Sequence, residues 1–135
     1  MKDVVSVRVL FSDGEFEDAT IEYRYDASAQ ECSMTCSSPS FGQLEVVAED
    51  IFNALIELRV AYEKCGVQLL CAGARPDVWP SGMSRSMGGG RKAYVCRMGE
   101  SATRLLDIFE YARPDSVGTV AEQARFREAW TSGFE

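Results

Sequence analysis

Histidine is absent from this chain of 135 residues. Its absence excludes Ser-His-Asp and Cys-His catalysis, histidine-containing zinc sites and the usual general base near neutral pH. An enzyme with this sequence would depend on carboxylates, lysine, tyrosine or cysteine. We therefore expect a protein that is not an enzyme and that has no metal site and no cofactor.

Long apolar runs and CxxC motifs are also missing. No stretch of about 18 apolar residues is present to cross a membrane. The apolar part of the N-terminal MKDVVSVRVLF is too short for a signal peptide, and apolar and polar residues alternate in it. The five cysteines are odd in number and mostly sit in apolar runs: Cys32, Cys36, Cys65, Cys71 and Cys96. These features predict a cytoplasmic protein with reduced core cysteines and no membrane partner.

Basic charge is scarce and unevenly distributed. The net charge is −7, and residues 1–72 alone carry 5 basic and 13 acidic groups. Residues 73–98 reverse the sign, with five basic groups against Asp77. Because phosphate affinity needs a basic surface, the sequence predicts no broad nucleic-acid interface. An acidic surface favours basic protein partners and speeds their capture.

The apolar pattern predicts a single α+β domain over residues 1–135. Val5, Val7, Val9 and Phe11 fall on one face of an alternating segment, which is typical of a half-buried strand. We expect a mostly antiparallel sheet of five to six strands, with one long helix and a C-terminal helix packed on it. The strands are predicted over residues 4–11, 21–25, 32–36, 67–72 and 93–98, and the helices over residues 43–65 and 119–131. The pattern of residues 105–111 is ambiguous, and a final strand with a short helix close behind it is the favoured interpretation.

Both helices carry local signals. An apolar stripe starting at Val47 recurs at steps of three and four, and Gly66 stands where a C-terminal glycine belongs. Thr119 and Glu122 fit a capping box at the start of the last helix. Phe126 and Trp130, one turn apart on that helix, fit a core-packing stripe better than a partner groove.

The first candidate site is the acidic turn DGEFED. Asp13, Glu15, Glu17 and Asp18 surround Phe16. If the following strand extends back through this turn, Glu15 and Glu17 share one side. A protruding acidic tip with an aromatic centre is a typical anchor for a basic partner. The alternative is a solvated hairpin turn.

The second candidate site is the long connection over residues 73–92. Three consecutive glycines precede Arg91 and Lys92, so backbone amides and two cations are candidates to hold a phosphate. No nucleotide-binding motif frames these glycines, however. The other interpretation is an ordered scaffold or second partner contact, in which Arg75 pairs with Asp77 and the apolar side chains pack the loop down. The residues of this candidate are Arg75, Asp77, Trp79, Met83, Arg85, Arg91 and Lys92.

The central region ARPDVWPSGMSRSMGGGRKAY resembles small bacterial proteins that serve as immunity proteins in polymorphic toxin systems, including contact-dependent growth inhibition and Rhs-type toxins. The C-terminal TVAEQ, followed by Phe126 and Trp130, adds to the likeness. The resemblance implies a cytosolic inhibitor, monomeric when free, that binds a cognate toxin domain and blocks its active site. The acidic tip would then occupy a basic toxin cleft. Two alternative functions stay open: a small phosphate- or nucleotide-binding protein that uses residues 88–92, and a structural or adaptor subunit whose partner is a second copy of the chain.

Overall fold

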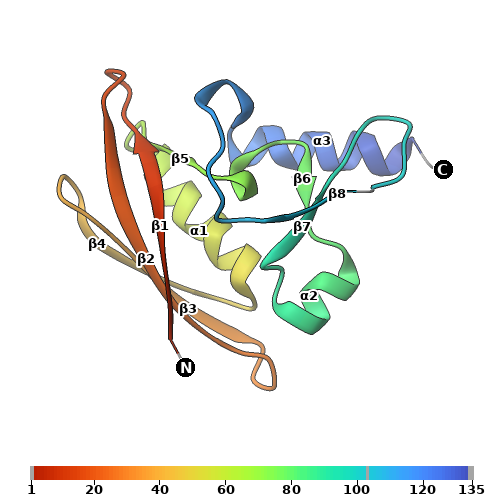
Figure 1. Ribbon diagram of the computed structural model, residues 1–135, viewed down its shortest axis with the longest axis horizontal. Coiled ribbons are helices and arrows are strands. Elements are labelled where there is room, and N and C mark those ends of the chain that lie inside the picture. The colour runs from red at the N-terminus through yellow and green to blue at the C-terminus, as the bar shows by residue number, and fades with distance from the viewer. Residues whose placement is uncertain (1, 103, 134–135) are drawn as a thin grey trace.

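The computed structural model describes residues 2–102 and 104–133 (Figure 1). Within these residues the chain is α+β, as predicted, with three α-helices and two antiparallel sheets. The sheets have five and three strands, whereas the sequence predicted one sheet of five to six strands. The later strands pair with one another and form a second, smaller layer beside the helices.

The larger sheet is a meander extended by one strand from the middle of the chain. Its order is β4-β3-β2-β1-β5, and all its neighbours are antiparallel. Val5, Ile21, Cys36 and Leu44 lie in register across four strands on the inner face. The three predicted N-terminal strands are confirmed. The bounds are β1 Asp3–Leu10, β2 Phe16–Asp26, β3 Glu31–Ser38, β4 Gly42–Ala48 and β5 Gln68–Leu70.

The long helix, α1 Ile51–Glu63, begins eight residues later than residue 43, where the sequence predicted its start. The prediction was wrong because Leu44, Val46 and Ala48 alternate in burial with the exposed Gln43, Glu45 and Val47 and form β4 instead. Asp50 follows the end of β4 and caps the helix, since its side chain accepts a hydrogen bond from the Asn53 amide at 2.8 Å. Gly66 has a positive φ of 74° in the turn that follows the helix, where left-handed backbone favours glycine.

The segment predicted as a loop over residues 73–92 contains three short elements. They are the 3₁₀ helix η1 Ala72–Ala74, the strand β6 Val78–Trp79 and the helix α2 Gly82–Gly88. The sequence did not predict α2, because the helix is only seven residues long, begins and ends with glycine and has no buried residue. Ser81 nevertheless caps it by accepting from the Ser84 amide at 3.0 Å. The strands β7 Lys92–Val95 and β8 Arg104–Asp107 complete the smaller sheet, in the order β6-β7-β8.

The C-terminal helix, α3 Val120–Ser132, follows the 3₁₀ helix η2 Pro114–Ser116. The capping box of Thr119 and Glu122 is confirmed. The predicted core stripe is not: among the described residues of α3 only Gln123 is buried, and Phe126 and Trp130 are half-buried. The helix contacts α1 and lies beside the smaller sheet (Figure 1).

The main core lies between the inner face of the larger sheet and α1. Leu55 and Leu58 of α1 are fully buried against sheet residues such as Ile21 and Met34. Each such side chain contributes about 1.5–3 kcal/mol through burial. Four cysteines are buried as predicted, whereas Cys65 is exposed. None of the helices in the described residues has the length and apolar character needed to cross a bilayer.

Candidate functional site

The glycine-rich turn after α2 caps the N-terminus of α1. The Gly89 carbonyl accepts hydrogen bonds from the amides of Ile51 at 2.8 Å and Phe52 at 3.2 Å. These amides are among the unpaired donors at the start of any α-helix. The Asp50 side chain satisfies the next amide, so the start of α1 is capped from within the chain.

Glycine is required at positions 89 and 90 for steric reasons. Both have positive φ, 68° and 80°. A Cβ at Gly89 would lie 2.7 Å from the Tyr25 ring, and one at Gly90 would lie 2.8 Å from Cβ of Phe52. These glycines therefore allow the turn to approach the helix and the sheet closely.

The amides of this turn are already used within the chain. The amides of Gly89, Gly90 and Arg91 donate to the carbonyls of Arg85, Ser84 and Gly88, respectively. An anion nest needs successive amides that point at the ligand. The turn thus lacks the arrangement that the phosphate-binding hypothesis requires.

Arg91 is held by side chains from other elements. Its guanidinium pairs with Asp107 at 3.0 Å, donates to the Tyr23 hydroxyl, and lies over the Tyr23 and Phe109 rings at 5.7 and 5.0 Å. Burial alone would raise the pKa of Asp107, but hydrogen bonds from Arg91 and the Phe109 amide hold that pKa below its ordinary value. Lys92 lies 3.8 Å from the same carboxylate. Arg91 thus joins the two sheets.

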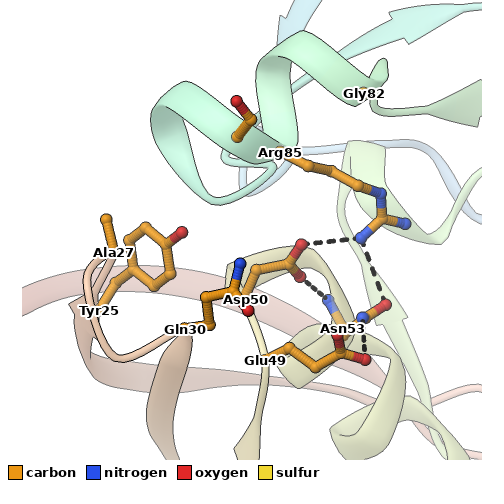
Figure 2. Close-up of a pocket in the computed structure, with 9 residues that line it drawn as sticks. Tyr25, Ala27, Gln30, Glu49, Asp50, Asn53, Gly82 and Arg85 are labelled. Carbon is orange, nitrogen blue, oxygen red and sulfur yellow. Dashed lines mark hydrogen bonds and ion pairs between the residues drawn. The ribbon is translucent and has the colours of Figure 1, made fainter.

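A polar pocket of about 550 Å³ opens between the β2–β3 turn, the start of α1 and α2 (Figure 2). Arg85 crosses it to Asp50 at 2.9 Å and to the Asn53 side-chain oxygen at 3.4 Å. Asp50 therefore uses one oxygen for Arg85 and the other for the Asn53 amide. The pocket is lined by Tyr25, Ala27, Gln30, Glu49, Asp50, Asn53, Gly82, Arg85 and Ser86. The charges of Arg85 and Asp50 neutralise each other, and this ion pair links α2 to the start of α1.

Of the other residues predicted in this segment, three make contacts within the chain and Met83 does not. Arg75 and Asp77 form the expected pair, a two-pronged contact at 2.9 and 2.7 Å. Trp79 packs edge-on against Phe52, with 5.2 Å between the ring centroids. Met83 does not pack the loop down as expected, because its side chain projects into solvent from α2.

A buried polar cluster behind this segment was not predicted. Arg59 of α1 donates to the carbonyls of Gly73, Ala74 and Gly118 and to the side-chain oxygen of Gln123. The Gln123 amide group donates to the carbonyls of Gly73, Arg75 and Val78 at 2.9–3.0 Å. Burial lowers the pKa of Arg59. The only sequence signal for this cluster was the position of Arg59 within the predicted long helix. The sequence could not indicate its partner, because Gln123 lies 64 residues away.

The acidic tip is the turn between β1 and β2, and its side chains point in different directions. Phe16 is 51% exposed at the first position of β2. Asp18 pairs with Arg8 across the strands at 3.3 Å. Glu17 accepts two hydrogen bonds from Ser40, which lower its pKa. Glu15 precedes the strand, and its amide donates to Asp13 at 2.9 Å.

The acidic tip and α2 lie at opposite ends of the molecule (Figure 1). The structure therefore does not bring the two predicted sites together. No protein-family model and no curated protein matches this chain.

Among the residues that the structure describes, no group of three or more acidic or cysteine side chains gathers in a way that could hold a metal ion. Burial raises the pKa of Cys32 and of Cys71 to about 11, so neither is a ready nucleophile. Exposed large apolar side chains include Phe16 at the acidic tip and, most exposed of all, Met83 and Met87 of α2.

Proposed function

We propose that this protein is a cytoplasmic immunity protein, not an enzyme, that binds a cognate toxin domain and blocks its active site. The observation that carries the proposal is the Phe16 ring, which is 51% exposed at the first position of β2, next to the acidic β1–β2 turn in sequence. The resemblance of residues 74–94 to such immunity proteins and the net charge of −7 support it.

The tip offers the two components of a tight protein contact. An aromatic side chain that fills a pocket on the partner contributes much of the binding energy of an interface. Carboxylates around it complement a basic cleft, such as that of a nuclease, and accelerate association. Glu15 and Asp18 are the exposed acids nearest Phe16 in sequence, so we assign the electrostatic contact to them.

Glu17 has a different role in this proposal. Its carboxylate connects the β1–β2 turn to the β3–β4 turn through Ser40. It therefore holds the hairpin in place, while Phe16 and the outward acids contact the toxin.

The test is a purified complex with the product of the neighbouring upstream gene, the expected toxin. We expect Phe16→Ser to weaken binding at least about tenfold, as for an interface hot spot. Glu15→Gln/Asp18→Asn should slow association and flatten its salt dependence. Glu31→Gln/Glu57→Gln is the matched control, because it removes two exposed acids elsewhere in the chain.

Co-expression provides the functional measurement. The wild-type chain should protect cells from the toxin domain, and the Phe16→Ser chain should protect them less at equal abundance. A wild-type chain that neither binds nor protects would contradict the proposal.

A further inference from the structure

An apolar groove of about 290 Å³ lies between α2 and the exposed face of the smaller sheet. Met83 and Met87 are four residues apart on α2 and so share one face of the helix. Tyr94 and Leu105 are cross-strand partners on β7 and β8 and line the same groove. Four apolar side chains from three elements thus converge on one surface.

The exposure of these side chains is high. Met83 is 72% exposed, Met87 is 79% exposed and Leu105 is 51% exposed. An apolar patch rimmed by polar residues on a soluble protein marks an interaction site. Methionine suits such a site, because its unbranched, polarisable side chain adapts to the shape of a bound segment.

The walls of the groove are fixed before anything binds. Ser81 caps α2, and the Ser84 hydroxyl donates to the Lys92 carbonyl, which joins the helix to β7. Arg85, on the other side of α2, is anchored to Asp50 of the polar pocket. Because the helix and the strand are already held together, binding has to order only the exposed side chains of the groove, which limits the loss of conformational entropy.

The charge at the groove is opposite to that of the whole chain. Arg91 and Lys92 are the only charged residues among those that line it. Among the described residues, both form an ion pair with the same acid, Asp107, and the Lys92 side chain is more than half exposed. The groove therefore complements carboxylates around an apolar segment.

We propose that this groove binds a segment of a partner protein that inserts apolar side chains between α2 and β8 and places carboxylates against Lys92. The partner's chemistry is opposite to that of the basic cleft proposed for the acidic tip. Since the two surfaces lie at opposite ends of the molecule, this contact is independent of the toxin-blocking function (Figure 1).

The test uses the full chain and three short synthetic peptides: one alternating glutamate with leucine, one alternating lysine with leucine, and one alternating glutamate with serine. Binding is measured by calorimetry at low and high salt. We expect only the glutamate–leucine peptide to bind, and Met83→Ser/Met87→Ser to weaken it at least about tenfold. Lys92→Gln should weaken it at low salt and make little difference at high salt.

Val4→Ser/Val47→Ser is the matched control, because both valines are more than half exposed but lie on the outer face of the larger sheet. It should bind the peptide like the wild type. The proposal is overturned if the glutamate–leucine peptide does not bind, if the lysine–leucine peptide binds equally well, or if the methionine variant binds unchanged. Reversible self-association that the methionine variant abolishes would assign the groove to a second copy of the chain and overturn it as well.

Discussion

Replacing Gln123 with alanine should destabilise the fold strongly, although Gln123 lies on a mostly exposed helix. Its side-chain oxygen accepts a hydrogen bond from Arg59, and its two N–H groups are shared among the carbonyls of Gly73, Arg75 and Val78. Each hydrogen bond contributes about 1 kcal/mol net, and a bond to a charged group contributes more. In the Gln123→Ala variant the Gly73 carbonyl still accepts a hydrogen bond from Arg59, which limits the loss of stability. We expect the free energy of unfolding to fall by about 3–5 kcal/mol.

Urea unfolding at neutral pH provides the assay, with the midpoint compared at a constant slope. Gln43→Ala is the control, because Gln43 is exposed on the edge strand β4; it should change stability by less than about 0.5 kcal/mol. A loss below about 1 kcal/mol for Gln123→Ala would refute the view that this cluster holds α1, α3 and the 73–78 segment together.

Three further predictions concern the turn after α2 and its ion pairs. Gly89→Ala should lower stability in thermal unfolding by about 2–5 kcal/mol through left-handed strain and contact with Tyr25, whereas Gly82→Ala, with open space around its Cβ, should be nearly neutral. Phosphate and nucleotides should leave the melting temperature unchanged, since the turn's amides are occupied; a ligand-dependent rise would restore the phosphate-binding hypothesis. Asp107, with its lowered pKa, stabilises the fold above its unfolded pKa near 3.8, and this contribution disappears as the pH falls through the folded value. Asp107→Asn should therefore cost more stability at pH 7 than at acid pH, and an equal cost at both would contradict this.

The sequence predicted those parts of the fold that depend on local pattern. The β1–β3 meander follows from strict alternation, and the capping box of Thr119 and Glu122 marks the start of α3. The start of α1 was missed because Val47 fits both a helical stripe and an alternating strand, and only pairing with β3 decides between them.

The functional surfaces were harder to predict because they depend on long-range contacts. The role of Gly89 requires Tyr25 and the start of α1 to be close, which the sequence around the glycines does not reveal. Met83 was expected to pack inward, yet α2 turns it outward next to Met87 and forms the groove. The acidic tip was identified from its composition. The sequence did not reveal that Asp18 pairs with Arg8 and that Glu17 binds Ser40, because both contacts depend on the fold.

The central claim is that Phe16 and its neighbouring acids contact a toxin domain. The most direct measurement is the affinity of the purified chain for the product of the neighbouring upstream gene, with wild type and Phe16→Ser compared by calorimetry. We predict a one-to-one complex that the substitution weakens at least about tenfold. The absence of a complex, or equal affinities for the two chains, would contradict the claim.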